Sequence, residues 1–121
     1  MLIIANINKE FHYMIKKALI KPLSVNRAWQ GRRFKTDDYK QYEKELFYML
    51  PKLEIPKGKL KIDFVVSYKN KLSDIDNFLK PFIDILQKKY GFNDRNIYEL
   101  SIKKEIGEEF IEFNIEKYED I

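Results

Sequence analysis

The sequence predicts a single small α+β domain, spanning residues 1–121, in which a mixed β-sheet is flanked by two α-helices. Residues 60–68 alternate between apolar and polar side chains, which is the period of a strand with one face in the core. Apolar residues at 36–50 and 76–90 recur at helical spacing. Of the 121 residues, 45% are hydrophobic and 15% aromatic, which suffices for one packed core.

The first part of the chain is expected to hold two extended segments and a loop. Residues 1–7 are apolar and β-branched and predict a short strand, and residues 11–20 are also expected to be extended. Residues 23–35 have no clean period and therefore predict a loop. The aromatic side chains of Trp29 and Phe34 either hold this loop against the core, which we favour, or stack on the exposed bases of a nucleic acid.

Both helices have identifiable ends. Thr36 is placed to be the N-cap of the first helix, and Pro51 closes it. The buried face of this helix is predicted to carry Tyr39, Tyr42, Leu46, Met49 and Leu50. The second helix is expected to begin at Asp76 or Asn77 and to end in a glycine stop at Gly91.

Two further strands are predicted after the second helix, at 97–106 and 110–117. Gly107 and Glu108 stand between them and are typical of a hairpin turn. Because such a turn joins neighbouring antiparallel strands, these two strands are expected to pair with each other.

The composition excludes several classes of site. The chain has no cysteine, which excludes disulfides, thiolate zinc sites and cysteine nucleophiles. Its only histidine is His12, so a multi-histidine metal site is excluded and a serine-histidine mechanism is disfavoured. No run approaches the ~20 apolar residues of a membrane span, and the first residues lack the basic start of a signal peptide. We therefore expect a cytoplasmic protein with no membrane partner.

Charge is distributed unevenly along the chain. The formal net charge is +4, but residues 9–35 hold eight basic residues against one acid, whereas residues 98–121 hold three basic and eight acidic residues. Such asymmetry is common on soluble surfaces, where it serves solubility. It also suits a polyanionic partner such as nucleic acid.

Three aspartates around the second helix are candidate metal ligands. Asp74 and Asp76 precede this helix, and side chains two residues apart in an extended stretch point the same way, so both can reach one ion. Hard cations such as Mg²⁺ take oxygen ligands and keep several waters, so two or three carboxylates suffice. Asp94 follows the helix. It meets the other two only if the chain doubles back, because a helix of ~12–14 residues is ~20 Å long.

The same residues also allow a purely structural interpretation. In this alternative, Asp74 caps the helix and Asp94 only begins a turn. The acids Asp76 and Asp84 then form ion pairs, four residues apart, with the cations Lys80 and Lys88.

A resemblance to a known family favours the metal site. The run D-I-D-N-F-L-K-P-F-I-D-I-L at 74–86, followed by N-D-R-N-I at 93–97, resembles the signature of RusA-type Holliday junction resolvases. That signature pairs D-x-D-N-x-x-K-x-x-x-D-x-L with a later acidic doublet. The sequence S-V-N-R at 24–27 also resembles the N-terminal pattern of the family. The resemblance covers residues 21–115, and its D-x-D-N-x-x-K part is far more specific than a bare D-x-D.

The resemblance implies a RusA-like fold and a homodimeric endodeoxyribonuclease that depends on Mg²⁺ or Mn²⁺. Such an enzyme cuts branched DNA, typically four-way junctions, in recombination and repair, and family members are frequent in phages and prophages. It implies that Asp74, Asp76 and Asp94 are the metal-binding catalytic acids and that Lys80 is a supporting cation. One departure is Asn93, where the family usually has a second acid. The lost negative charge lowers the expected affinity for the metal.

Five cations are expected to contact the DNA backbone, on the grounds of charge and neighbourhood: Arg27, Arg32, Arg33, Lys69 and Lys71. Two alternative functions remain open. One is a nucleic-acid-binding or junction-binding module with weakened catalysis, which Asn93 favours. The other is a non-enzymatic interaction domain whose basic and acidic segments form a subunit contact.

Overall fold

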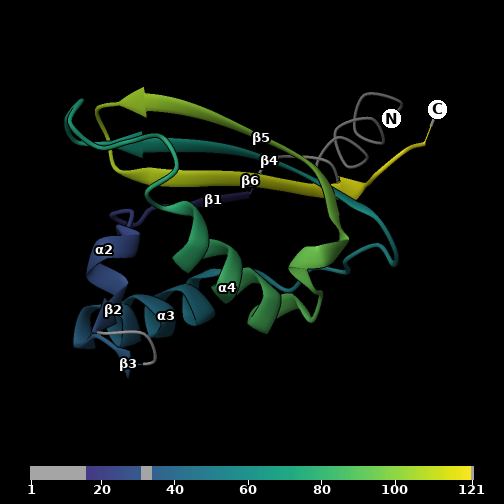
Figure 1. Ribbon diagram of the computed structural model, residues 1–121, viewed down its shortest axis with the longest axis horizontal. Helices are drawn as coiled ribbons and strands as arrows, with labels where there is room; N and C mark the ends of the chain where they lie inside the picture. The colour runs from purple at the N-terminus through teal and green to yellow at the C-terminus, as the bar shows by residue number, and fades with distance from the viewer. Residues whose placement is uncertain (1–15, 31–33, 121) are drawn as a thin grey trace, which may run out of the picture.

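The computed structural model describes residues 16–30 and 34–120, which form a four-stranded mixed sheet with the helices gathered on one side of it (Figure 1). In chain order the elements are β1 (Lys16–Ala18), α2 (Val25–Ala28), β2 (Trp29–Gln30), β3 (Phe34–Lys35), α3 (Asp37–Met49), β4 (Leu60–Tyr68), α4 (Leu79–Tyr90), the 3₁₀ turn η1 (Asp94–Asn96), β5 (Ile97–Ile106) and β6 (Phe110–Lys117). The strand order is β1-β6-β4-β5, with β4 antiparallel to β6 and parallel to β5. The predicted α+β class and mixed sheet are confirmed. The strand predicted at 1–7 lies outside the described residues, as does the part of 11–20 before Lys16.

β4 is the centre of the core, since it has a strand on each side and one fully apolar face. The buried residues on that face are Leu60, Ile62, Phe64, Val66 and Tyr68. α4 packs on this face through edge-to-face aromatic contacts, which add to the gain from apolar burial. The Phe64 ring centroid lies 5.3 Å from that of Phe78 and 5.9 Å from that of Phe82.

The first long helix forms as the sequence predicts. Thr36 is the N-cap of α3, and its hydroxyl accepts a hydrogen bond of 3.1 Å from the backbone N–H of Tyr39. Of the predicted buried face, Tyr39, Tyr42, Leu46 and Leu50 are buried. The prediction for Met49 was wrong, because its side chain is exposed. None of the helices in the described part of the chain is long and apolar enough to cross a membrane.

α4 ends as predicted but begins later than expected. Gly91 closes it with a φ of 75°, a conformation that glycine adopts without steric cost. The predicted start at Asp76 or Asn77 was wrong, because the helix begins at Leu79 with Phe78 as a cap that makes no side-chain hydrogen bond. Phe78 is fully buried against the sheet, so residues 75–78 form a turn that carries it into the core before the helix starts.

The predicted hairpin between β5 and β6 was wrong, although both strands form at the predicted residues. β5 and β6 lie on opposite sides of β4, and their connection crosses over the end of that strand. The backbone N–H of Gly107 donates to the carbonyl of Tyr68, 2.8 Å away, at this crossing. β4 is the most apolar strand, so placing a neighbour on each of its edges buries it most completely.

The predicted loop at 23–35 contains more structure than expected. It holds the short helix α2 and a two-stranded ribbon of β2 and β3. Trp29 is held against the core as predicted, with its ring centroid 5.3 Å from that of Tyr39. The same prediction was wrong for Phe34, which is 72% exposed.

Candidate metal centre and nucleic-acid interface

The two acids of the D-x-D motif lie on a turn between β4 and α4. The backbone N–H of Asn77 donates to the carbonyl of Asp74 at 3.2 Å, and that of Leu79 donates to the carbonyl of Asp76 at 3.0 Å. Both aspartate side chains are exposed. The turn therefore fixes the backbone and leaves the two carboxylates available to solvent, a metal ion or a phosphate-bound metal.

Two contacts from other elements anchor this turn. The Lys104 ammonium, at the end of β5, donates to the backbone carbonyl of Lys71 at 3.1 Å and to that of Ser73. On the other side, the backbone N–H of Val25 in α2 donates to the carbonyl of Asn77 at 2.9 Å. This turn, residues 74–79, is called the acid turn below. It is thereby tied both to the sheet and to the S-V-N-R segment.

The motif-based prediction missed Lys104. A lysine in an alternating strand carries no motif, and its role depends on a contact across more than thirty positions of sequence. One signal was present: Lys104 is two residues after Ile102, so it points to the helix-covered face, where a charged side chain needs a partner.

Tyr68 ends β4 beneath the acid turn, and its hydroxyl has no hydrogen-bond partner within the described part of the chain. Burial, helped by the nearby carboxylates of Asp76 and Asp74 and opposed by the backbone N–H of Phe78, raises the pKa of Tyr68 to about 12. Tyr68 therefore stays protonated at neutral pH. Its O–H is an unused donor next to two carboxylates.

The structural interpretation of the acids is confirmed only in part. Asp94 begins a turn, as that interpretation requires, but Lys80 pairs with Asp84 at 3.4 Å instead of with Asp76, and Lys88 pairs with Glu43 at 3.1 Å instead of with Asp84. Neither acid of the D-x-D motif forms an ion pair with any residue in 16–30 or 34–120, and Asp74 does not cap α4. Unlike Asp84, the motif acids are not used by the fold.

Asp94 lies at the other end of α4 from the acid turn. It begins η1, just before β5, and its backbone N–H donates to the side chain of Gln87 at 2.8 Å. Figure 1 shows η1 and the loop after β4 at opposite ends of α4, which has 12 residues and is therefore about 18 Å long. Within residues 16–30 and 34–120 of one chain, no three acidic or histidine side chains come close enough to hold a metal ion. The structure thus places Asp74 and Asp76 on one turn and Asp94 at the other end of α4.

Asn93, which stands where the family usually has an acid, has a structural role in this chain. Its side-chain oxygen accepts a hydrogen bond of 3.0 Å from the backbone N–H of Arg95 and so caps η1. An aspartate accepts the same bond, so capping alone does not require the amide.

Cations surround the acid turn on the side of α2. Arg27 on α2, together with Lys69 and Lys71 on the loop after β4, is exposed. A groove of about 580 Å³ runs between α2, α3 and this loop, and both Arg27 and Ser73 line it. The other two predicted DNA-binding residues, Arg32 and Arg33, lie outside the described residues.

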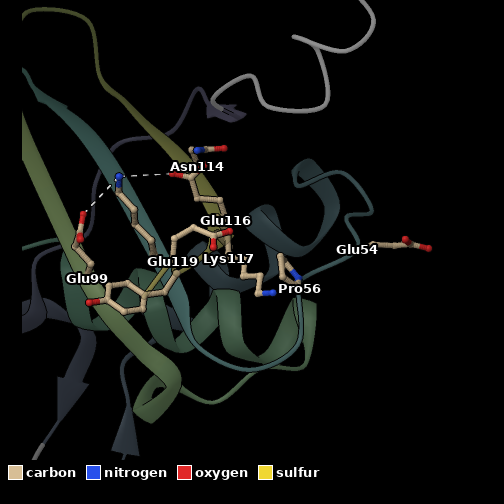
Figure 2. A pocket seen from close by; sticks show the side chains of 10 residues that line it. Glu54, Pro56, Glu99, Asn114, Glu116, Lys117 and Glu119 are labelled. Atoms are coloured by element: carbon tan, nitrogen blue, oxygen red, sulfur yellow. Dashed lines mark ion pairs between the residues drawn. The ribbon is translucent and has the colours of Figure 1, made fainter. Parts of the chain in front are cut away.

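Another cleft lies on the sheet face away from the helices (Figure 2). It has a volume of about 630 Å³, and Lys61 within it pairs with Glu99 at 3.4 Å and with Glu116 at 3.6 Å. Glu54 and Glu119 also line it. Two lysines, Lys61 and Lys117, stand against these four acids, so the lining is net negative and repels phosphate, and this cleft does not suit DNA.

The donor set of the acid turn fits a hard divalent cation. Mg²⁺ is usually bound by one or two carboxylates together with water and substrate phosphate. Asp74 and Asp76 offer two exposed carboxylates, and the hydroxyl of Tyr68, which has no hydrogen-bond partner among residues 16–30 and 34–120, offers a donor to a ligand oxygen. Nothing in this set favours a soft metal, since it contains neither thiolate nor imidazole.

The model of the family described as Endodeoxyribonuclease RusA matches residues 21–116, which is most of the chain and includes all three aspartates. A search of the curated proteins finds no match.

Proposed function

Because the chain belongs to the RusA family of endodeoxyribonucleases, we propose that it cuts branched DNA, four-way junctions above all, in recombination and repair. The observation that carries this proposal is the exposed pair Asp74 and Asp76, which lies in the matched segment and forms no ion pair with the described residues. We also propose a cytoplasmic location, because the proposed substrate is DNA.

The proposed cofactor is Mg²⁺, with Mn²⁺ as a substitute, held by Asp74 and Asp76. When bound, such an ion activates a water for attack on the phosphodiester and neutralises the leaving oxygen. Lys80 is 64% exposed on its side chain in the first turn of α4, and its contact with Asp84 at 3.4 Å is an exposed i,i+4 pair worth little. The Lys80 ammonium is therefore available to turn toward a scissile phosphate and to stabilise negative charge as it develops.

The proposed active form is a homodimer in which two chains build each centre. Asp94 does not reach Asp74 and Asp76 in its own chain, since the length of α4 separates them. A two-fold axis supplies the partner's Asp94 to the acid turn of the first chain, and the reverse. Two equivalent centres then face a substrate that itself has near two-fold symmetry.

The direct test is cleavage of labelled four-way junction, duplex and single-stranded DNA with Mg²⁺, with Mn²⁺ and with EDTA. We expect metal-dependent nicking that is fastest on the junction. Tight junction binding without nicking in either metal would instead support the alternative that Asn93 favours, a binding module with weakened catalysis. Equal, salt-insensitive and weak binding to all three DNA forms would support the non-enzymatic interaction domain.

Removing three cations beside the acid turn is expected to weaken DNA binding without changing its preference. The triple variant Arg27→Ala, Lys69→Ala, Lys71→Ala removes exposed charges that contact phosphates in this proposal. The slope of log affinity against log salt should fall by roughly 2 to 3, since each phosphate contact contributes about 0.9. A matched triple, Lys52→Ala, Lys57→Ala, Lys117→Ala, removes exposed lysines away from the turn and should leave the slope nearly unchanged. Equal slopes for the two variants would place the DNA surface elsewhere.

Lys104 is expected to be a positioning residue for the acid turn. In Lys104→Met the carbonyls of Lys71 and Ser73 lose their shared donor, so the turn loosens while the aliphatic packing is kept. Cleavage should fall by about 10- to 100-fold, the usual cost of losing a group that orients metal ligands. The half-saturating Mg²⁺ concentration should rise at the same time, and Lys104→Arg should restore part of the activity. A purely structural role would lower the melting temperature and leave the Mg²⁺ requirement unchanged.

A further inference from the structure

The hydroxyl of Tyr68 is a buried donor that the fold does not use. Tyr68 is the last residue of β4 and is only 6% exposed. Its hydroxyl oxygen is buried and makes no hydrogen bond with any residue in 16–30 or 34–120. Buried polar groups almost always have a partner, because a donor that leaves water without one costs free energy. A donor kept in this state beside two exposed carboxylates indicates that its partner arrives when the site is occupied.

The fold holds the Tyr68 ring in place beneath the acid turn. Its backbone carbonyl accepts a hydrogen bond of 2.8 Å from the N–H of Gly107. The Lys104 ammonium lies 5.9 Å from the centroid of the ring and also donates to the carbonyl of Ser73. The alternation of β4 places the Tyr68 side chain on the helix-covered face, where the chain turns back into α4 (Figure 1). The hydroxyl is therefore fixed, and its partner has to come to it.

The groups beside the hydroxyl leave the carboxylates as its acceptors. The backbone N–H of Phe78 and the ammonium of Lys104 are donors, so neither can accept the hydroxyl proton. Burial is the largest cause of the raised pKa of Tyr68, and of the two carboxylates that add to it, Asp76 has a larger effect than Asp74. The carboxylate of Asp76 is thus the nearer acceptor.

We propose that Tyr68 is a positioning residue for the metal centre, whose hydroxyl donates to one carboxylate oxygen of Asp76 while the other oxygen binds the divalent cation. A carboxylate has lone pairs enough for both. Asp76 is exposed and forms no ion pair with the described residues, so its side chain is able to turn inward. This inference rests on the proposed function only in taking the acid turn as the metal centre.

Such a hydrogen bond fixes the orientation of a metal ligand. Carboxylates that bind a metal are usually held by a second group, and losing that group typically costs about 10- to 100-fold in metal affinity or activity. Tyr68 suits this role because its ring is already packed, so little side-chain freedom is lost when the metal binds. The unmet donor of the metal-free protein is satisfied at the same moment.

The variant Tyr68→Phe tests the proposal through metal binding in the absence of DNA. Mn²⁺ binding to the full chain, followed by electron paramagnetic resonance of the free ion, should weaken by about 10-fold. In EDTA the melting temperature of Tyr68→Phe should equal or exceed that of the wild type, because the variant no longer buries a donor without a partner. A structure of the wild type with Mn²⁺ should place the Tyr68 oxygen about 2.5–2.7 Å from an Asp76 carboxylate oxygen.

Two other tyrosines provide matched controls. The hydroxyl of Tyr90, at the far end of α4, donates to the carbonyl of Pro51 at 2.7 Å. Tyr90→Phe should therefore lower the melting temperature and leave the Mn²⁺ affinity unchanged. Tyr42 on α3 also buries a hydroxyl that has no hydrogen-bond partner among the described residues. Tyr42→Phe should behave like Tyr68→Phe in EDTA and like the wild type in Mn²⁺ binding.

Three results would overturn the positioning role. One is an unchanged Mn²⁺ affinity in Tyr68→Phe, and another is a wild type that binds no Mn²⁺. The third is a lower melting temperature of Tyr68→Phe in EDTA, since this would mean that the hydroxyl is already bonded within the metal-free fold.

The outcome separates this proposal from the proposed function. If Tyr68→Phe binds Mn²⁺ more weakly but the wild type nicks no DNA form, the positioning role is kept and the nuclease is lost. If the wild type nicks junctions with Mg²⁺ and Tyr68→Phe has the wild-type Mn²⁺ affinity, the nuclease is kept and the positioning role is lost.

Discussion

Asp76→Asn is expected to reduce the cleavage of four-way junctions by at least about 100-fold, since even a group that only orients a metal ligand costs 10- to 100-fold. The amide keeps the size of the side chain but loses the charge that holds the metal in the proposed centre. Asp76 is exposed and forms no ion pair with the described residues, so its loss should barely change stability. Binding of the junction in EDTA should be unchanged or slightly tighter, because one negative charge near the phosphates is gone. Single-turnover cleavage and a mobility-shift titration measure the two effects.

Asp37→Asn is the matched control for this variant. Asp37 is also an exposed aspartate close to a helix start, in the first turn of α3, but it lies outside the acid turn. The cleavage rate of Asp37→Asn should equal that of the wild type. Undiminished cleavage by Asp76→Asn would show that the acid turn is not the metal centre.

Phe82→Ala should have the largest effect on stability of any single change in the core. Phe82 is fully buried, and its ring centroid lies 5.9 Å from that of Phe64 and 5.7 Å from that of Phe113, so it joins α4 to two strands. Truncating such a side chain costs about 3–5 kcal/mol, from lost burial and the cavity left behind. For a domain of this size the melting temperature should fall by roughly 10–20 °C. Thermal unfolding followed by circular dichroism measures this directly.

Phe34→Ala is the control for Phe82→Ala, since it removes the same atoms from a residue that is 72% exposed. Its melting temperature should lie within about 2 °C of the wild type, as for most surface changes. A similar loss of stability for both variants would mean that Phe34 is covered in solution, and that the ribbon of β2 and β3 packs differently from the structure.

Local signals in the sequence were enough to predict most of the elements. The N-cap at Thr36, the alternation of β4 and the glycine stop at Gly91 each depend on residues within a few positions of one another. The D-x-D motif was found for the same reason, because Asp74 and Asp76 lie on a single turn. What the sequence alone predicts well is therefore chemistry that a short stretch of chain can build.

Features that depend on contacts far apart in the sequence were not predictable in this way. Gly107 and Glu108 are typical of a hairpin, yet β5 and β6 are separated because both pair with β4. The anchoring role of Lys104 depends on where the loop after β4 crosses β5. The position of Asp94 likewise follows from β5 running parallel to β4, which places its start at the far end of α4.

Subunit complementation tests the shared metal centre most directly. Asp76→Asn and Asp94→Asn should each be inactive alone. After the two are mixed and allowed to exchange subunits, half of the dimers contain one chain of each kind, and in each of these one centre carries both changes and the other neither. We therefore predict that nicking returns to about a quarter of the wild-type level, since a two-fold dimer has two such centres. If mixing restores no nicking although mixed dimers form, Asp94 does not act across the dimer and the account of a shared centre is wrong.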